Sequence, residues 1–421
     1  MTNERQPNNS SPDHPAAPSQ PTLNVRAKIV AYRIAGGLGR VTRGLLSKLP
    51  FLSRMLNVPT GRISSLRKWV EDYRRRVPWD QRRTAAHYRR VRRPMRASAS
   101  APPRSLVPND VPAVVWLRDY DIHHELFLAS IPHARVLGPN GVVITPDDKI
   151  AEESAWIGDG WLEQDRARRA LHLPKPEALE GHYFTIASFD SQGYAHWILD
   201  ALPRLSLLRY ATPQTKVIVS QLAAQWQRDS LTHLGLNLDE LVVLGNRHLA
   251  LELLHVPSYI GQPGRIHPSA VNWLRKKFLT GEQSLEAGKR LYLTRRGGRR
   301  HVINEDELEP ILRRFDFEII NSGEFSFADQ IELFSRAEAI AGPHGAALTN
   351  SVFAPAACKI FELFAPTCVR PMYYQLASVI GQSYWYLVGR ENSDARETDR
   401  GFDNMWISPE EFERTLSDMF S

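Results

Sequence analysis

Three short stretches of the sequence combine residue types that bind phosphate or move protons. The first is the turn Gly342-Pro343-His344-Gly345, which follows the apolar run 337–341 and precedes Ala346 and Ala347. Glycine and alanine leave the backbone open to close approach, and the free N–H groups at a helix start favour a phosphate. We therefore expect a diphosphate against Gly345, Ala346 and Ala347, with His344 donating to a phosphate oxygen or contacting a sugar.

Glu362 stands twenty residues after Gly342, at the end of the next expected strand. An acid at that place in an α/β nucleotide site accepts hydrogen bonds from ribose hydroxyls. The alternative is that Glu362 caps a helix and that the glycines only make a tight turn from strand to helix. Spacing alone leaves both interpretations open.

Arginines follow an expected strand upstream, in the segment LYLTRRGGRR at residues 291–300. Arginine is always charged and forms bidentate contacts with phosphate oxygens, so Arg295 or Arg296 can neutralise a nucleoside-diphosphate leaving group without a metal. We predict donor-binding positions at these two residues. Arg299 and Arg300 are expected in a solvated basic loop.

The third stretch is SQGYAHWILDALPRL, residues 191–205. If residues 194–202 are helical, His196 and Asp200 stand four apart on one face, where the carboxylate can orient the imidazole or act beside it. This pair can remove a proton from an acceptor hydroxyl, and Arg204 can hold an acceptor or brace the helix. A purely structural His–Asp pair is the alternative, and which of the two residues is the base stays open.

Other chemistries find little support. Asp119-Tyr120-Asp121 matches an Asp-x-Asp metal pattern that is short and common, and His123 and His124 are adjacent rather than spaced as ligands on a helix. No GxSxG, HExxH or P-loop string occurs, so the hydrolase, metalloprotease and P-loop functions are unsupported. We therefore expect no metal at these residues.

The elements that must position these residues alternate between strands and helices from residue 105 onward. In the first half the pattern predicts strands at 113–117, 142–145, 183–188, 217–220 and 241–244, with helices at 194–208 and 223–234. In the second half it predicts strands at 290–294, 317–320, 337–341, 359–363 and 385–388, with helices at 305–314, 327–336, 346–353 and 373–380. Asn304 and Ser326 have N-cap spacing at two of the helix starts.

Alternating strands and helices imply parallel sheets with crossover helices, and therefore the α/β class. We expect two Rossmann-like domains facing a cleft: an acceptor-side domain over 105–250 and a nucleotide-sugar-binding domain over 251–421. The length of 421 residues, with 43% hydrophobic and 24% charged residues, fits two packed domains with extensions.

The segment before residue 105 differs in composition. Residues 1–23 are rich in Pro, Ser, Asn and Gln and are expected to be a disordered tail. Residues 24–104 are expected to be a basic amphipathic helical extension, because apolar residues recur at spacings of three and four between basic ones over 34–52. Such a face lies on an anionic membrane or docks on the protein itself or a subunit partner. The arginines of 74–96 lack a nucleic-acid reading motif, so we expect no nucleic-acid partner.

Cys358 and Cys368 are the two cysteines, and their spacing fits neither a disulfide framework nor a zinc site. The polar N-terminus lacks the pattern of a signal peptide, and no apolar run reaches about 18 residues, the length that a membrane span needs. We expect a cytoplasmic protein, with any membrane contact being peripheral on the inner face of the cytoplasmic membrane.

The three motifs in this order resemble glycosyltransferase family 61. The resemblance rests on HWILDALPRL, then YLTRR followed by INEDEL, then SFADQIELFSRAEAIAGPHGAALTN and a closing FEL, and it covers about residues 110–390. The family includes bacterial capsular-polysaccharide biosynthesis proteins, plant xylan arabinosyl- and xylosyltransferases, and animal N-acetylglucosaminyltransferases. It implies a GT-B fold and an inverting transfer of a hexosyl or pentosyl group from a nucleotide sugar without an essential metal.

Residue by residue, the resemblance implies a His-Trp-x-x-Asp motif at His196 and Asp200, and donor-site positions at Arg295, Arg296, His344, Gly345 and Glu362. It predicts a donor that is UDP-linked, a glycan or lipid-linked glycan acceptor, and a place in capsular or cell-surface polysaccharide biosynthesis. It also favours membrane contact through residues 25–56. The alternative function is a non-catalytic sugar- or nucleotide-binding scaffold in a polysaccharide-assembly complex, docked by the basic helices.

Overall fold

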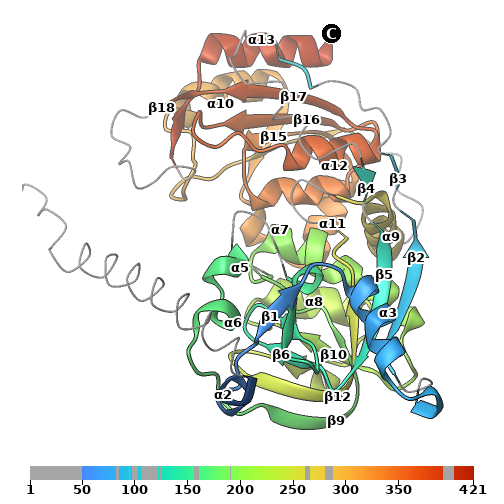
Figure 1. Cartoon of the computed structure of the whole chain (residues 1–421). Helices are drawn as coiled ribbons and strands as arrows, with labels where there is room; N and C mark the ends of the chain where they lie inside the picture. The colour runs from blue at the N-terminus through green and yellow to red at the C-terminus, as the bar shows by residue number, and fades with distance from the viewer. Residues whose placement is uncertain are drawn as a thin grey trace, which may run out of the picture.

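The computed structural model describes residues 50–81, 85–93, 95–96, 103–105, 122–123, 125–155, 161–189, 191–260, 266–279, 288–391 and 403–421. Within these ranges the chain forms a ten-stranded sheet, a five-stranded sheet and two short strand pairs. Figure 1 shows the five-stranded sheet above the ten-stranded one, with helices between them. The α/β class is confirmed. Residues 1–49, which include the expected tail, and the expected strand at 113–117 lie outside the described residues.

The ten-stranded first sheet is mixed rather than Rossmann-like. Its parallel part consists of β12 (His248–Pro257), β9 (Glu177–Thr185), β10 (Lys216–Val219) and β11 (Val242–Val243), with helix α8 (Gln225–His233) between the last two along the chain. Its antiparallel part consists of β5 (Leu126–Pro132), β6 (Arg135–Leu137), β7 (Val142–Ile144) and β8 (Lys149–Ala151). The turns at 138–141 and 145–148 are too short for crossover helices, so the strands that they join must be antiparallel.

Residues 50–93 belong to this first sheet instead of forming a separate helical extension. Strand β1 (Gly61–Ile63) pairs with β8, and β2 (His87–Arg92) pairs with β5. Two helices, α2 (Pro50–Met55) and α3 (Leu66–Arg76), lie on either side of β1 along the chain. The all-helical expectation was wrong here, because Tyr88 and Val91 are half-buried on a strand that carries a bulge between Arg90 and Arg92.

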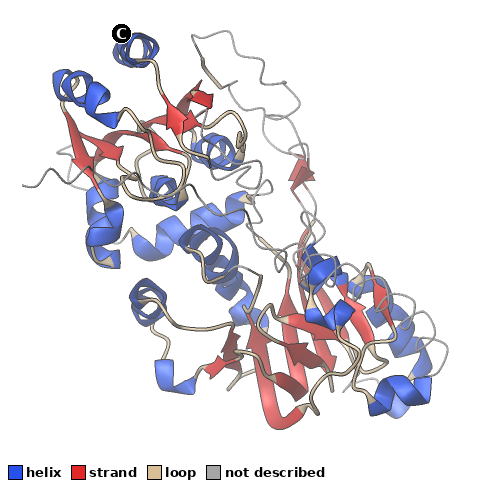
Figure 2. Cartoon of the chain, turned by 90° about the vertical axis from the view of Figure 1, so that its left-hand side faces the viewer, coloured by secondary structure: helices blue, strands red, loops and turns tan. Residues whose placement is uncertain are grey.

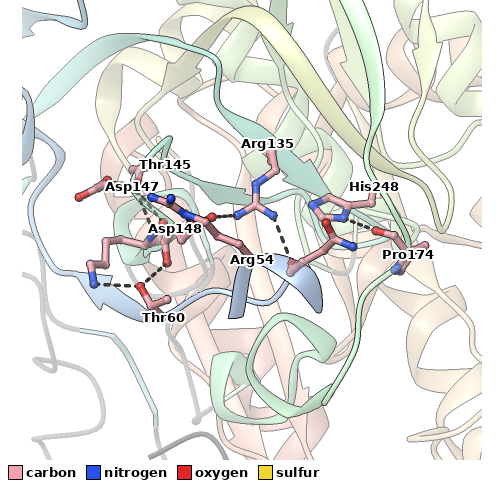
Figure 3. Close-up of polar contacts among 10 residues, drawn as sticks. Arg54, Thr60, Arg135, Thr145, Asp147, Asp148, Pro174 and His248 are labelled. Atoms are coloured by element: carbon pink, nitrogen blue, oxygen red, sulfur yellow. Dashed lines mark hydrogen bonds and ion pairs between the residues drawn. The ribbon is translucent and has the colours of Figure 1, made fainter. Parts of the chain in front are cut away.

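A polar network fixes the start of this segment to the first sheet (Figure 3). Arg135 on β6 forms an ion pair with Asp148 and donates to the Asn57 carbonyl oxygen at 3.2 Å. Lys149 Nζ donates to Thr60 Oγ1 at 3.0 Å. These contacts tie residues 57–60 to strands far along the chain, so this part of the N-terminal segment is integral to the first sheet.

His248 lies beside this network, with its Nδ1 2.9 Å from the Pro174 carbonyl oxygen (Figure 3). Burial is the main cause that lowers the pKa of His248 to about 4, and the nearby charge of Arg135 contributes to this lowering. The imidazole is therefore neutral near pH 7.

The second sheet is parallel throughout, in the order β14-β13-β15-β16-β17. Its strands are β13 (Lys289–Leu293), β14 (Phe317–Ile320), β15 (Ala337–Pro343), β16 (Lys359–Phe364) and β17 (Ser383–Val388). Helices α10 (Glu305–Arg314) and α13 (Pro409–Phe420) cover one face, and α11 (Phe327–Ser335) and α12 (Met372–Ile380) cover the other (Figure 1). A parallel sheet with helices on both faces is confirmed for this half. Since the strand order reverses between β13 and β15, their carboxyl ends form the expected ligand-binding edge.

One of the two expected N-caps is formed. Ser326 Oγ accepts a hydrogen bond from the Asp329 N–H at 3.2 Å at the start of α11. Asn304 precedes α10 but makes no such bond, because its amide binds both the N–H and the carbonyl of Ile407. Asn304 therefore ties α10 to the segment before α13.

A continuous hydrophobic core joins the two sheets. It includes Phe184 and Trp197 on the side of the first sheet and Ile340 and Phe364 on the second. Helix α9 (Pro268–Phe278) contacts both α12 and the helical segment at 202–210, and Figure 2 shows helices lying between the two groups of red strands. The boundary expected at residue 250 falls inside β12, which belongs to the first sheet as one unbroken strand.

The remaining elements of the described chain are short. They are α5 (Trp161–Gln164), α6 (Arg166–Arg169), β3 (Met95–Arg96), β4 (Ile122–His123), β18 (Arg390–Glu391), β19 (Met405–Trp406) and the 3₁₀ turns η1 (Trp79–Gln81), η2 (Glu152–Ser154), η6 (Leu238–Glu240) and η7 (Ser322–Glu324). Among the described residues, no helix combines the length and apolar character that crossing a membrane requires.

Candidate functional site

Arg295 lies directly over Gly345 at the ligand-binding edge of the second sheet. β13 ends at Leu293 and β15 ends at Pro343, so both residues lie just beyond neighbouring strands. A Cβ added to Gly345 would stand 1.7 Å from Arg295 Nη1. The absence of a side chain at residue 345 is therefore what leaves room for the guanidinium.

A second arginine approaches the same place. Gly297 has a φ of 76°, and the Gly298 N–H donates to the Arg295 carbonyl oxygen at 2.9 Å, so the chain reverses tightly after Arg295. Arg300 is half-buried, and its charge acts on both Arg295 and Tyr373. The expectation that Arg300 is merely solvated was wrong; the two glycines within RGGRR were the signal for this reversal.

Burial is the main cause that lowers the pKa of Arg295, and the neighbouring charge of Arg300 lowers it further. Two guanidinium groups near one another in a partly desolvated site repel each other. An anion bound between them would relieve this repulsion. The site therefore favours a ligand with more than one negative charge.

Glu362 is fully buried behind His344. Its Oε1 lies 2.5 Å from His344 Nδ1, and its Oε2 accepts a hydrogen bond of 2.5 Å from the Tyr384 hydroxyl. The ring of Phe364 stacks on His344 with the ring centroids 5.5 Å apart. Glu362 therefore faces two side chains of its own sheet, and in this arrangement neither carboxylate oxygen is left for ribose hydroxyls.

Because an ionised carboxylate only accepts hydrogen bonds, His344 Nδ1 carries a proton in this pair. The other ring nitrogen, Nε2, has no hydrogen-bond partner among the residues that the structure describes, and 8% of the His344 side chain stays exposed. His344 can thus meet a ligand through Nε2 while Glu362 holds the ring from behind.

Arg296, the other predicted phosphate ligand, is engaged elsewhere. Its guanidinium bonds to Glu305 at 2.7 Å and to Glu309 at 2.6 Å, and it pairs with Asp306 at 2.6 Å. The hydrogen bond to Glu305 raises the pKa of Arg296. Arg296 thus fastens the first turns of α10 to the end of β13, and the structure does not place its guanidinium over Gly345 as it does that of Arg295.

The segment after Gly345 is η8 (Ala346–Val352), a 3₁₀ helix of seven residues instead of the expected α-helix. Its first bond runs from the Leu348 N–H to the Gly345 carbonyl oxygen at 3.1 Å, so the helix does not use the N–H groups of Ala346 and Ala347. Side-chain bonds of Thr349 to Tyr373 and of Asn350 to Gln330 hold this segment against α12 and α11. A short 3₁₀ segment has a weak dipole, so Arg295, Arg300 and His344 must supply most of the attraction for an anion.

His196 and Asp200 lie on a helical segment of mixed type. It runs through α7 (Tyr194–His196), the π-helical turn η4 (Trp197–Ala201) and the 3₁₀ helix η5 (Leu202–Tyr210). His196 Nδ1 is 3.8 Å from Asp200 Oδ2, an ion-pair distance too long for a hydrogen bond. Asp200 is only 1% exposed, whereas the His196 side chain is 20% exposed. Of the two, His196 is the side chain that can meet an acceptor.

Arg204 is fully buried under the same helical segment. It donates to the carbonyl oxygens of Ala187 and Pro257, both at 3.3 Å, and its guanidinium stands 4.7 Å from the centre of the Tyr259 ring. Burial lowers the pKa of Arg204. Of the two alternatives for this residue, bracing of the helix fits the structure better than direct contact with an acceptor.

The two motif regions meet where α7 contacts η8. The Tyr194 hydroxyl donates to Asn350 Oδ1 at 2.6 Å, across the junction of the two halves. His196 therefore lies on a helix that touches the segment beginning at Ala346. In the part of the chain that the structure describes, no group of three or more His, Cys, Asp or Glu side chains could hold a metal; residues 119–121 and His124 lie outside that part.

Comparison with known proteins supports the family resemblance found in the sequence. Residues 194–361 match the family model described as Glycosyltransferase 61. This region is similar to glycosyltransferase family 61, and it makes up less than half of the 421-residue chain. It contains His196, Asp200, Arg295 and the turn at Gly345, and it ends one residue before Glu362. The resemblance inferred from the motifs is confirmed.

A curated relative supports the same family. The chain is 35% identical over 97 residues to the EGF domain-specific O-linked N-acetylglucosamine transferase of Drosophila melanogaster. The match covers 22% of this chain and 18% of that protein, so it spans less than a fifth of the relative's length.

Proposed function

We propose that this family 61 protein is an inverting glycosyltransferase that transfers a sugar from a nucleotide-sugar donor to a glycan acceptor. The observation that carries the proposal is the placement of Arg295 over Gly345, next to Arg300 and His344, at the carboxyl edge of a parallel sheet. Two guanidinium groups and an imidazole suit the charge of a nucleoside diphosphate, and they stabilise it most as it leaves.

In the proposed donor complex, Arg295 and Arg300 hold the diphosphate oxygens, and the N–H groups of Ala346 and Ala347 add uncharged donors. His344 Nε2 donates to a phosphate oxygen when the imidazole is protonated, and Glu362 orients that ring instead of binding ribose. Arg296 acts indirectly by holding α10 in place.

The proposed acid–base step starts at His196. Its imidazole removes the proton from an acceptor hydroxyl while the Asp200 carboxylate behind it stabilises the imidazolium that forms. The acceptor oxygen forms a bond to the anomeric carbon, and the bond from that carbon to the diphosphate oxygen breaks, leaving its electron pair on the diphosphate. A single displacement inverts the anomeric centre. His196 is the proposed base because Asp200 is 1% exposed.

Finer assignments extend this proposal. The Rossmann-like second sheet supports a GT-B-like arrangement with the donor on the C-terminal half. We propose a UDP-linked donor and a role in capsular or cell-surface polysaccharide biosynthesis. Because the Drosophila relative is named for N-acetylglucosamine, an N-acetylhexosaminyl donor is the first to test. Metal independence stays a prediction, to be checked by activity in EDTA.

We further propose that residues 25–56 contact the inner face of the cytoplasmic membrane, where a lipid-linked acceptor would be found. Helix α2 at the end of this segment supports it, because Phe51 is 74% exposed and Met55 is 62% exposed, with the Arg54 side chain 75% exposed beside them. Exposed apolar residues next to a basic one favour an anionic lipid surface. Co-sedimentation with vesicles containing phosphatidylglycerol tests this; equal binding by the Phe51→Ser/Met55→Ser variant would contradict it.

The donor site is tested by calorimetric titration of UDP into wild-type protein, Arg295→Ala and a control. Arg313→Ala is the matched control, because Arg313 lies on α10 with its side chain 76% exposed. We expect UDP to bind wild type and Arg313→Ala alike and to bind Arg295→Ala at least about tenfold more weakly. Equal affinity in all three proteins would remove Arg295 from the site.

A further inference from the structure

The hydrogen bond from Tyr384 to Glu362 has a consequence for His344. Glu362 on β16 is completely buried and accepts from His344 through one oxygen and from Tyr384 on β17 through the other. Tyr384 is itself 4% exposed, so solvent is largely kept from this contact. The three side chains thus form a chain of hydrogen bonds from the sheet interior to the ligand-binding edge.

We propose that Tyr384 is a positioning residue that sets, through Glu362, the orientation and the proton affinity of His344. The hydroxyl of Tyr384 takes up part of the negative charge of the Glu362 carboxylate. This limits how strongly the carboxylate holds the proton on His344 Nδ1. The contact of His344 Nε2 with a donor diphosphate rests on the function proposed above. The hydrogen bonds among His344, Glu362 and Tyr384 do not depend on that function.

The other groups near His344 are the same in every variant considered. Tyr373 on α12 has its ring centroid 5.5 Å from that of His344, and Arg295 and Arg300 act electrostatically on Tyr373 from the loop after β13. Phe364 stacks on the ring and carries no charge. Glu362 is the negative group in direct contact with the imidazole, so a change in how strongly the carboxylate accepts a hydrogen bond acts directly on His344.

Two substitutions should move the pKa of His344 in opposite directions. Tyr384→Phe removes a hydrogen bond from the carboxylate, which then binds the imidazolium more strongly, so the pKa of His344 rises. Glu362→Gln removes the negative charge, so the pKa of His344 falls. If Tyr384 had only a structural role, the two substitutions would not shift the pKa of His344 in opposite directions.

The experiment is an NMR titration of the full chain with ring-¹⁵N-labelled histidine, recorded without donor. His344→Gln assigns the His344 signal among the 14 histidines of the chain. Tyr386→Phe is the matched control, because Tyr386 is the register partner of Glu362 across β16 and β17, whereas it is the Tyr384 hydroxyl that donates to Glu362. We expect an upward shift in Tyr384→Phe, a downward shift in Glu362→Gln and no shift in Tyr386→Phe.

An unchanged His344 pKa in a folded Tyr384→Phe protein would overturn the proposal, even if Glu362→Gln fails to fold. A shift of the same size in Tyr386→Phe would also overturn it. The pH profile of transfer separates this result from the proposed function. If His344 donates a hydrogen bond to the diphosphate as an imidazolium, activity is lost as pH rises through the pKa of His344. Tyr384→Phe then moves the alkaline limb of the activity profile to higher pH. If the pKa of His344 shifts in opposite directions in the two variants but the alkaline limb of the activity profile does not move, Tyr384 positions His344 and His344 does not bind the donor.

Discussion

The Tyr194 hydroxyl donates to Asn350 Oδ1 at 2.6 Å, and this bond joins the helix of His196 to the segment that follows Gly345. Asn350 in turn donates from Nδ2 to Gln330 Oε1 at 2.8 Å, so both ends of its amide are held. Burial raises the pKa of Tyr194, and the phenol stays a hydrogen-bond donor at any pH of interest. The proposed base and the proposed donor site therefore lie on segments that are fixed to each other.

This bond predicts coupling between the two residues. Tyr194→Phe leaves Asn350 Oδ1 buried without its donor, so we expect the free energy of unfolding to fall by about 1–3 kcal/mol. Urea denaturation of Tyr194→Phe, Asn350→Ala and the double variant measures the coupling energy. Strictly additive losses would show that the contact contributes nothing of its own.

The two adjacent arginines should have different effects. Removing one preorganised donor to developing charge costs about 100- to 1000-fold in kcat, and we expect a loss near that range in Arg295→Ala at saturating donor. Arg296→Ala should keep most of kcat and instead lower the thermal midpoint, because Glu305, 3% exposed, loses its ion pair. Steady-state kinetics and thermal melts of both variants decide this. A larger loss of kcat in Arg296→Ala would reverse the assignment.

Gly345→Ala tests the contact between Gly345 and Arg295. A methyl group would meet Arg295 Nη1 at 1.7 Å and push the guanidinium away, so we expect donor affinity to fall about tenfold with little loss of stability. Gly323→Ala is the matched control, since its Cβ would meet nothing closer than 3.4 Å. In the Arg295→Ala background, Gly345→Ala should lower donor affinity only slightly further. Full additivity of the two effects on affinity would contradict the contact.

The proposed base predicts a difference between His196→Gln and Asp200→Asn. Loss of a general base costs about 100- to 10,000-fold, and we expect His196→Gln to fall in that range with donor affinity unchanged. Asp200→Asn should lose less, because the imidazole remains. Greater loss of kcat/KM in Asp200→Asn than in His196→Gln would make Asp200 the base.

The buried histidines of the first sheet predict a loss of stability in acid. Burial lowers the pKa of His248 to about 4 and that of His255 to about 4, from the ordinary histidine value of 6.5. Between those values the unfolded chain binds protons that the folded one does not, so the free energy of unfolding falls as pH drops from 6.5 toward 4. Urea denaturation at stepwise pH measures this. His255→Gln should flatten part of the slope, and an unchanged slope would contradict the lowered pKa.

The second half of the fold was predictable because each strand and helix there has a clear periodic pattern. α10 and β14 have the expected bounds, and the strand order places Arg295 beside Gly345 at the switch point. The first sheet was less predictable. β12 pairs with strands on both sides, and its antiparallel partners depend on short turns that an alternating pattern of strands and helices does not reveal.

The site was predictable in its residue types and less so in their contacts. Glu362 was expected to face ribose, yet it bonds to His344 and Tyr384, residues 18 and 22 positions away. Those contacts depend on neighbouring strands brought together by tertiary structure. Arg300 has a φ of 59°, a backbone state that its sequence context does not specify beyond the preceding glycines.

The central claim is tested most directly by turnover of nucleotide sugars. The full chain is incubated in EDTA with UDP-linked sugars, N-acetylhexosamines first, and a panel of glycan acceptors, while nucleoside diphosphate release and the anomeric configuration of the product are measured. We predict inverted product from wild type, with turnover lost in Arg295→Ala and His196→Gln and retained in Arg296→Ala. Tight binding of a nucleotide sugar that is never hydrolysed or transferred would contradict the account and indicate a non-catalytic binding scaffold.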